Sequence, residues 1–301
     1  MAIPTSRVKE TAKIRIDRSL CSNCGMCADV CVDTAVIFQD GKVLINDNPS
    51  FGCYGCGHCM AVCPEGAIEI HGRTLSPDDL LKLPGLDEAA GYSALLALFQ
   101  RRRSVRTFLD REVEPDIQQQ ILDAASTAPM GLPPSDVHVM VLDSRDKSRV
   151  FAVDFCKYLE KMKWFVSSWF RFLIRPFWGK AGDEVFMGFI RPLFRVYVNN
   201  MRKGKNLVTH DAPLVMYFYG SPYCDPADPV IAAATAMYAG ESLGLGTCMV
   251  GGVHPMIQRG KSARRFRKKY GIKYPSRQGL FVVFGYHKTQ WKHGIKRTFA
   301  G

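Results

Sequence analysis

Eight of the chain's eleven cysteines lie in two runs of identical spacing near the start of the sequence. Each run has the form C-x2-C-x2-C-x3-C. A 4Fe-4S cluster needs four thiolates at tetrahedral corners, and in doubled runs of this kind the fourth cysteine of each run ligates the other cluster. The spacing therefore predicts two clusters, one held by Cys21, Cys24, Cys27 and Cys63, and the other by Cys53, Cys56, Cys59 and Cys31.

The alternative interpretation of these cysteines is that they bind zinc in zinc ribbons. They pair two C-x2-C units around each metal, which would leave the third and fourth cysteines of each run unexplained. His58 lies inside the second run, but four cysteines already complete each predicted site. Gly25, Gly55 and Gly57 let the loop backbone wrap closely around an inorganic core. The pattern therefore favours two cubane clusters over zinc.

Over about residues 12–73 the two cysteine runs resemble those of bacterial two-cluster ferredoxins. The resemblance implies a small ferredoxin-type domain that transfers single electrons. Pro64 follows the second run, as it does in those proteins, whereas Val32 stands where a proline usually follows the first run. This departure affects only the local turn.

A second group of chemically suited residues is basic: Arg102, Arg103, Ser104 and Arg106, at the end of a helix predicted over 92–103. Arginine forks bind phosphate oxygens in pairs, and a serine hydroxyl adds a neutral donor. A basic run is also often a solvated helix face. The residues alone therefore leave both a phosphate site and a solvated face open.

From about residue 95 to 301 the chain resembles the nitroreductase-like FMN-dependent oxidoreductases, because the segments 102–108, 128–130, 244–252 and 284–286 match that family in order and spacing. The resemblance implies an α+β domain that binds FMN. It also implies the contact residues: Arg102, Arg103, Ser104 and Arg106 at the phosphate and ribityl chain, Val250, Gly251 and Gly252 with amides near flavin N5, and Arg297, next to Lys296, at the phosphate.

The middle motif departs from the family pattern. Members often show Pro-Ser-x-x-Asn-x-Gln-Pro-Trp, which reaches the flavin of the opposite subunit, whereas residues 129–135 here read PMGLPPS. We expect Pro129, Met130 and Gly131 to meet the flavin edge through their backbone, with an ordinary loop as the alternative. The polarity of the pocket and the choice of substrate are expected to differ accordingly.

Length and composition give room for these two modules. The 301 residues are 47% hydrophobic and carry a net charge of +12, which predisposes the chain toward anionic partners. Residues 1–75 hold 7 basic and 8 acidic side chains, a net charge of −1. The remaining residues therefore carry a net charge of +13. We expect a ferredoxin-like domain over 1–75, a connector over 76–94 and an FMN domain over 95–301.

The elements expected in the FMN domain give it an α+β architecture. Helical patterns cover 92–103, 114–126, 229–243 and 262–270, and short β-rich runs cover 137–142, 213–219, 247–250 and 280–284. Helices and strands do not alternate strictly, which is typical of α+β folds. No glycine-rich dinucleotide fingerprint is present, so nothing in the sequence marks a dedicated NAD(P)H site.

Residues 157–205 form an expected helical insertion that holds three of the chain's four tryptophans among many cations. We expect amphipathic helices broken at Pro176 and Pro192. Dimer packing and a substrate lid are the leading interpretation, and contact with an anionic membrane is the alternative. The basic run 259–273 contains no acid and fits either a docking patch for an acidic redox carrier or a solvated helix.

Together these features predict an oxidoreductase. Electrons from an external low-potential donor such as ferredoxin are expected to pass through both clusters to FMN and on to a nitroaromatic, quinone or activated alkene. The alternative is an electron-transfer subunit that serves a protein partner, with possible membrane contact. We expect a cytoplasmic protein, because no signal peptide or membrane span is evident. The family that the chain resembles is usually a symmetric dimer, so we expect a homodimer. Nucleic acid is not expected as a partner. No side chain stands out as the proton donor.

Overall fold

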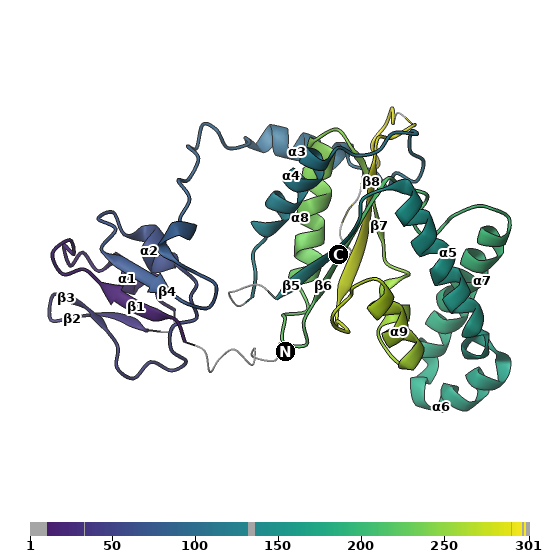
Figure 1. The fold of residues 1–301 in the computed structure, drawn as a ribbon, viewed down its shortest axis with the longest axis horizontal. Coiled ribbons are helices and arrows are strands. Elements are labelled where there is room, and N and C mark those ends of the chain that lie inside the picture. Colours follow the sequence, from purple (N-terminus) through teal and green to yellow (C-terminus); the bar gives the residue numbers. More distant parts are fainter. Residues whose placement is uncertain (1–10, 33, 132–135, 290, 297, 299–301) are drawn as a thin grey trace. The chain divides into compact units, whose positions relative to one another are not determined.

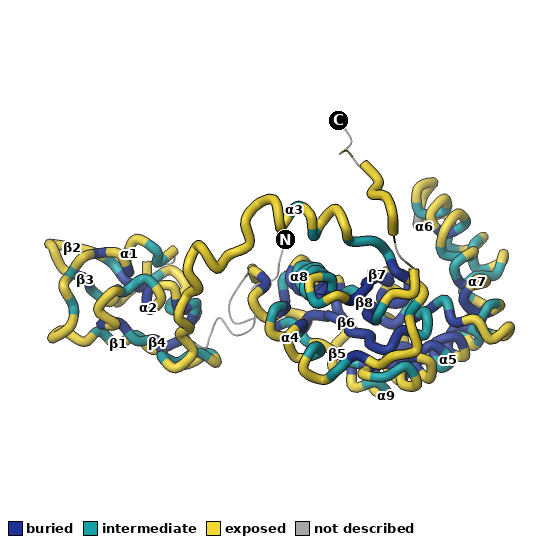
Figure 2. The backbone as a smooth tube through the Cα atoms, turned by 90° about the horizontal axis from the view of Figure 1, so that it is seen from above, coloured by how far each residue is buried: buried dark blue, intermediate teal, exposed yellow. Residues whose placement is uncertain are grey.

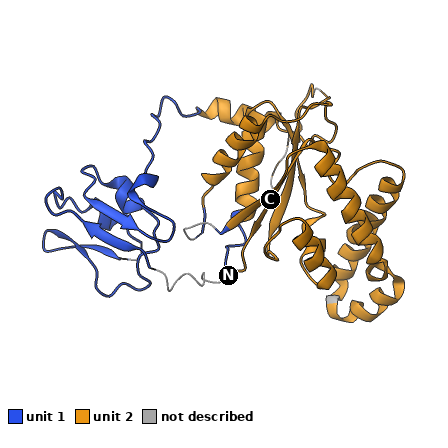
Figure 3. Cartoon of the chain, viewed as in Figure 1, with its two compact units in different colours: residues 1–90, 130–136, 223–228 blue, residues 91–129, 137–222, 229–301 orange. Residues whose placement is uncertain are grey.

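The computed structural model describes residues 11–32, 34–131, 136–289, 291–296 and 298. The chain divides into two compact units (Figures 1 and 3). The first comprises residues 1–90, 130–136 and 223–228, and the second comprises 91–129, 137–222 and 229–301. Two short stretches from the later sequence thus group with the first unit.

The first unit is built from two antiparallel strand pairs and two short helices. The pairs are β1 (Lys13–Ile16) with β4 (Ile68–His71), and β2 (Val36–Gln39) with β3 (Lys42–Ile45). The helices are α1 (Met26–Asp29) and α2 (His58–Val62), with a 3-10 turn, η2 (Pro77–Asp79), beyond them. Alternating residues of the strands bury Val36, Val43, Ile68 and Ile70 in one small core.

The second unit is organised around a four-stranded sheet in which all neighbours are antiparallel. Its order is β5 (Val137–Leu142), β6 (Leu214–Gly220), β8 (Gly279–Gly285) and β7 (Gly246–Val250). Each strand lies within one residue of its predicted range. Every residue of β6 is buried, which explains its unbroken apolar sequence. The predicted α+β class is confirmed.

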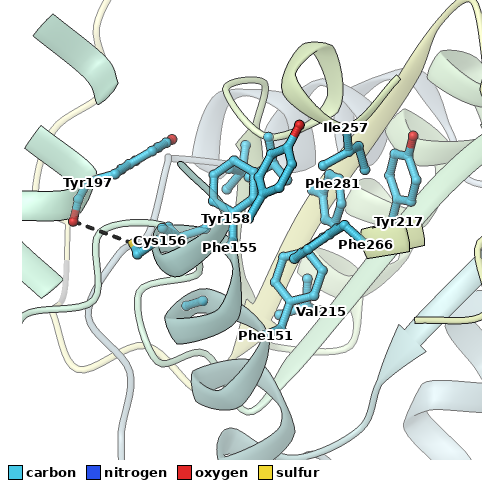
Figure 4. Packing of buried hydrophobic residues seen from close by; sticks show 14 of the residues in the cluster. Phe151, Phe155, Cys156, Tyr158, Tyr197, Val215, Tyr217, Ile257, Phe266 and Phe281 are labelled. Atoms are coloured by element: carbon cyan, nitrogen blue, oxygen red, sulfur yellow. Dashed lines mark hydrogen bonds between the residues drawn. The ribbon is translucent and has the colours of Figure 1, made fainter. Parts of the chain in front are cut away.

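Helices cover both faces of this sheet (Figure 1). One face packs on α4 (Pro115–Ser126) and α8 (Asp228–Ser242). The other packs on α5 (Arg145–Lys161), α7 (Arg191–Arg202) and α9 (Lys261–Lys269) around an aromatic core (Figure 4). There the rings of Tyr217 and Phe281 stack with centroids 4.0 Å apart. The remaining short turns are η3 (Lys163–Val166) and η5 (His254–Ile257).

The helical insertion differs from its predicted form. We expected a break at Pro176, but α6 (Ser168–Val185) continues past that residue and leaves helical geometry at Gly179, where φ is 67°. Glycine adopts this conformation without the clash that a Cβ would cause. The expected break at Pro192 is also wrong, because the backbone stays helical through a wider π-helical turn, η4 (Phe186–Ile190), into α7.

Two features of the helices bear on function. The helix α3 (Tyr92–Arg101) buries none of its residues, although its sequence is largely apolar. Within the described ranges, no helix is both long and apolar enough to cross a membrane.

Candidate functional site

The structure brings the fourth cysteine of the second run to the first three cysteines of the first run. Cys21, Cys24, Cys27 and Cys63 line one cavity, together with Ile16 and Ile68. Burial raises the pKa of the Cys27 thiol, and the nearby thiols of Cys63 and Cys24 add to the effect. Gly25 precedes α1 with a φ of 82°, so the loop turns back on itself where the thiols gather.

The other four cysteines form a matching set. Burial raises the pKa of Cys53, and it raises the pKa of Cys59 to about 12. Neighbouring thiols contribute to both shifts, and Cys31 and Cys56 are among them in each case. The structure thus brings Cys63 to the first run and Cys31 to the second. That each of these crossed sets ligates one cluster stays a prediction.

The fourth cysteine of each run, Cys31 or Cys63, accepts a hydrogen bond from a backbone amide, which the sequence analysis did not predict. The Sγ of Cys31 accepts the amide of Val36 at 3.4 Å, and the Sγ of Cys63 accepts the amide of Ala67 at 3.3 Å. Backbone amides that donate to ligating sulfurs hold them in place and raise the reduction potential of a cluster. Two sets of four thiols, in which every cysteine except Cys24 is at least partly buried, fit two 4Fe-4S clusters.

Within the described part of the chain, no three His, Cys, Asp or Glu side chains are placed to bind one metal ion. The set of Cys21, Cys24, Cys27 and Cys63 instead lines a cavity.

In the second unit, the basic segment lies against the start of β7. Ser104 and Thr247 form a parallel β-bridge, and the amide of Val105 donates to the carbonyl of Thr247 at 2.9 Å. This contact needs a glycine at position 246, because a Cβ there would lie 2.7 Å from Val105 and 2.9 Å from His287. Two motifs far apart in sequence are thereby joined.

Glu241 stabilises this junction and was missed by the sequence analysis. Its Oε1 accepts the amide of Thr247 at 3.1 Å and the Thr247 hydroxyl at 2.6 Å. Burial raises the pKa of the Glu241 carboxyl, while the two Thr247 hydrogen bonds and the positive charge of Arg102 act in the opposite direction. The available signal was its position at the end of α8, one turn before the glycine-rich segment.

The arginines of the segment differ in their surroundings. Arg103 is half-buried and donates to the carbonyl of Arg102 at 2.7 Å, whereas Arg106 is exposed. Among the described residues, no carboxylate forms an ion pair with Arg102, Arg103 or Arg106. Their guanidinium groups therefore remain available to an anion.

His210 is a second residue that the sequence analysis missed. Burial lowers its pKa to about 4, and the positive charge of Arg106 contributes to the shift. His210 and Asp211 have φ values of 57° and 49°, in the left-handed region that few residues other than glycine adopt. Asp211 is fixed by Arg149 and Asn206, each at 2.8 Å. The loop before β6 is thus held in a strained conformation beside Arg106.

The remaining predicted flavin contacts are distributed as follows. Val250 is buried at the end of β7, Gly251 is exposed, and a Cβ on Gly252 would lie 2.7 Å from the hydroxyl of Tyr197. Arg297 lies outside the described residues, but the preceding segment passes close to Arg103, because a Cβ on Gly294 would lie 2.7 Å from the Arg103 guanidinium. Its neighbour Lys296 is exposed.

The middle motif is exposed at Pro129, Met130 and Gly131. Met130 and Gly131 group with the first unit, whereas Pro129 and the other predicted flavin contacts belong to the second. The amide of Gly131 donates to Asp228 at 2.9 Å, and burial raises the pKa of that carboxyl.

Comparison with known proteins places both parts of the chain. The nitroreductase family matches residues 99–286, and the 4Fe-4S dicluster domain matches residues 11–68. Pyruvate synthase subunit PorD of Thermotoga maritima is 36% identical over 75 residues, which are 23% of this chain and 74% of that protein. Indolepyruvate oxidoreductase subunit IorA of Methanothermobacter marburgensis is 35% identical over 60 residues, or 20% of this chain and 9% of that protein.

Among solved structures, a nitroreductase from Bacteroides fragilis, determined with bound FMN, is similar to this chain with a TM-score of 0.52 and 17% sequence identity. The alignment covers 69% of this chain and 95% of that one. This likeness concerns the fold, while the family match extends over most of the chain. The protein is therefore an oxidoreductase that belongs to the nitroreductase family, with a 4Fe-4S dicluster domain preceding the family's own domain.

Proposed function

We propose that the protein uses its two 4Fe-4S clusters together with FMN to transfer electrons from reduced ferredoxin to a small organic acceptor. Acceptors of the right chemistry are nitroaromatics, quinones and activated alkenes. Clusters carry single electrons and a flavin stores two, so the pair links a one-electron donor to two-electron chemistry. The proposal depends chiefly on the junction of Ser104 with Thr247, which joins a phosphate-type segment to a glycine-rich strand.

The residues of the second unit fit FMN. Arg102, Arg103, Ser104 and Arg106 offer charged and neutral donors that suit a dianionic phosphate. The exposed backbone at Gly251 leaves room for a ring system beside β7. Arg297 is proposed as a further phosphate contact, and Pro129, Met130 and Gly131 as contacts of the flavin edge. The cysteine sets headed by Cys21 and Cys53 are proposed to hold one cluster each.

A homodimer is part of the proposal. The helix α3 presents an apolar sequence to solvent, with Tyr92 77%, Leu95 40% and Phe99 42% exposed. Apolar helices with a free face are normally covered by a partner. A second copy that covers α3 would form a symmetric interface. Light scattering is expected to give twice the chain mass, and a stable FMN-loaded monomer would contradict this assembly.

We also place the protein in the cytoplasm. The three cysteines outside the cluster sets, Cys156, Cys224 and Cys248, are buried free thiols. Disulfides form mainly in oxidising compartments, and thiols persist where the environment is reducing.

A second candidate function comes from the relatives of the first unit. PorD is a subunit of pyruvate synthase, and IorA is a subunit of indolepyruvate oxidoreductase. In this alternative, the chain passes electrons to a protein partner and its own flavin site does not turn over a small molecule.

Turnover by the isolated protein separates the two functions. Purified protein loaded with iron, sulfide and FMN is mixed with reduced ferredoxin and a nitroaromatic under anaerobic conditions. Sustained consumption of the nitroaromatic supports the enzyme, provided that protein without FMN is inactive. Failure to bind FMN, or activity that appears only with a protein partner, contradicts the enzyme and favours the electron-transfer subunit.

A further inference from the structure

We infer that Arg73 raises the reduction potential of one of the two clusters and so biases electrons toward it. We call Cys21, Cys24, Cys27 and Cys63 the first set, and Cys53, Cys56, Cys59 and Cys31 the second set. The favoured cluster is that of the second set. The inference rests on the proposed function, in which each set holds one cluster, and it adds a residue that directs electrons within the first unit.

Arg73 lies in a tight turn just after β4, the strand that pairs with β1 in the first unit (Figure 2). The amide of Gly72 donates to the carbonyl of Leu75 at 2.9 Å, and the amide of Leu75 donates back at 3.1 Å. The two central residues, Arg73 and Thr74, have φ values of 54° and 71°. Such turns favour glycine or asparagine. An arginine is therefore held here in a strained backbone conformation, and strain of this kind concentrates at functional sites.

The turn packs on the loop that carries three cysteines of the second set. Gly55 lies between Cys53 and Cys56 in that loop and has a φ of 71°. A Cβ added to Gly55 would lie 3.4 Å from the Cβ of Arg73 and 3.4 Å from the carbonyl oxygen of Gly72. The Arg73 side chain therefore starts beside the backbone that positions two of the four thiols.

The Arg73 guanidinium influences these thiols and has a donor to spare. Burial raises the pKa of the Cys53 thiol, and the positive charge of Arg73 acts in the opposite direction. The Nε of Arg73 is buried and has no hydrogen-bond partner among the described residues. A buried donor needs an acceptor, and the sulfur atoms of a cluster would supply one. This donor therefore fits the group that the second set is proposed to hold.

The first set resembles the second but has a neighbour of opposite charge. The two sets match in burial apart from the exposed Cys24, since each contains one buried cysteine, Cys27 or Cys59. The fourth cysteine of each run also accepts one backbone amide. The cavity of the first set is lined in addition by the exposed Glu65. A nearby positive charge favours the reduced form of a cluster and a negative charge disfavours it, so Arg73 and Glu65 bias electrons in the same direction.

The transfer that this bias favours is a one-electron exchange. Reduced ferredoxin is the proposed source of the electron. When an electron moves from the first set to the second, the cluster of the first set is oxidised and that of the second set is reduced. No proton moves and no ligand bond breaks. Arg73 is half-buried, so solvent screens its charge less than that of an exposed cation.

Potentiometric titrations of the full chain, followed by electron paramagnetic resonance, test the inference. Cys27→Ala should leave only the cluster of the second set, and Cys59→Ala only that of the first, so each potential is measured separately. In the Cys27→Ala background, Arg73→Gln is expected to lower the ratio of reduced to oxidised cluster at a fixed potential by about tenfold. That change equals about 59 mV for one electron. In the Cys59→Ala background, Arg73→Gln should leave the ratio nearly unchanged.

Three further variants separate charge from other effects. Arg73→Lys keeps the charge and should retain most of the wild-type ratio. Arg15→Gln is the matched control, because it removes an equal charge from a side chain of β1 that is 76% exposed and paired with Glu69. It should shift neither cluster. Glu65→Gln in the Cys59→Ala background should raise the ratio of reduced to oxidised cluster in the first set.

Iron analysis distinguishes failure of the inference from failure of the proposed function. Loss of nearly all iron in Cys27→Ala or in Cys59→Ala would show that the sets do not hold separate clusters, and would overturn both. When half of the iron is retained, an unchanged potential in Arg73→Gln would overturn the inference alone. Equal shifts in the two backgrounds would also overturn it, because Arg73 would then not act selectively on the second set.

Discussion

Ser104 and Thr247 meet in a parallel β-bridge that connects the end of an arginine-rich segment to the first residues of β7. The bridge is reinforced on one side by the amide of Val105 and on the other by the carboxylate of Glu241. It fixes donors that suit a phosphate beside a strand that ends in Gly251. This arrangement is the physical basis of the proposed flavin site.

Loss of one donor is expected to weaken FMN binding without unfolding the domain. Each charge-assisted hydrogen bond to phosphate contributes about 1.5–3 kcal/mol, so Arg103→Gln should raise the FMN dissociation constant by about 10-fold to 100-fold. Fluorescence quenching of FMN measures this change. Arg101→Gln, on the exposed end of α3, is the matched control and should bind FMN normally. Unchanged affinity in Arg103→Gln would remove Arg103 from the phosphate site.

Glu241 is expected to stabilise the fold in a manner that depends on pH. Glu241→Ala leaves the amide and hydroxyl of buried Thr247 without their acceptor, at a cost of about 1–3 kcal/mol for each group. Because burial raises the folded-state pKa, the folded protein binds more protons than the unfolded chain just above the ordinary glutamate pKa. Stability from this group therefore falls as pH rises through that window.

Glu241→Gln should remove that component, since an amide does not titrate, while it retains an acceptor for Thr247. Denaturant unfolding of the wild type and both variants at several pH values provides the measurement. A Glu241→Ala variant as stable as the wild type would show that Thr247 finds another acceptor.

His210 is expected to give the stability of the fold the opposite pH dependence to that of Glu241. Its folded-state pKa is lowered to about 4 by burial, so between about pH 6.5 and 4 the unfolded chain binds a proton that the folded protein does not. Stability should decrease as pH falls through this range. His210→Asn should flatten the dependence, because asparagine does not titrate and accepts the left-handed conformation at this position.

Thermal unfolding between pH 5 and 7 compares the two proteins, with the exposed His293→Asn as the control. An unchanged slope in His210→Asn would show that this imidazole is not the source of the pH dependence.

The crossed cysteine sets can be distinguished from uncrossed ones by paired substitutions. Cys27→Ala and Cys63→Ala act on the same proposed cluster, so the double variant should retain about half of the wild-type iron, as should either single variant. Cys27→Ala combined with Cys31→Ala acts on both clusters and should lose nearly all of it. Iron analysis and electron paramagnetic resonance of the reduced proteins measure the outcome. The reverse pattern would show that each run ligates its own cluster.

Much of the fold and of the cysteine sites can be predicted from the sequence because the motifs that carry them are local. The spacing of Cys21 to Cys63 predicts how the thiols gather, and the short β-rich runs, of which β6 is an unbroken apolar one, predict the strands of the sheet. Contacts between distant segments were not accessible in the same way. In the sequence, Glu241 is indistinguishable from any other polar helix residue, and only the fold brings Thr247 to its carboxylate. The pKa of His210 is lowered only by its burial in the folded loop.

The helical insertion over residues 157–205 shows where predictions from local sequence preferences fail. Proline predicts helix breaks at residues 176 and 192, yet the backbone departs from the helix at Gly179 and widens before Pro192. Pro192 falls in the first turn of α7, where the missing amide of a proline is tolerated, and Gly179 adopts the non-helical backbone conformation inside α6.

The central claim is that electrons enter at the clusters and leave through the flavin, and an anaerobic titration of the FMN-loaded protein tests it most directly. Reduced ferredoxin, NADH and NADPH are added separately while cluster and flavin absorbance are followed, and a nitroaromatic is then added. The account predicts that ferredoxin alone bleaches both chromophores and that the nitroaromatic restores them. Direct reduction of the flavin by a nicotinamide, or a reduced flavin that the nitroaromatic leaves unchanged, would contradict it.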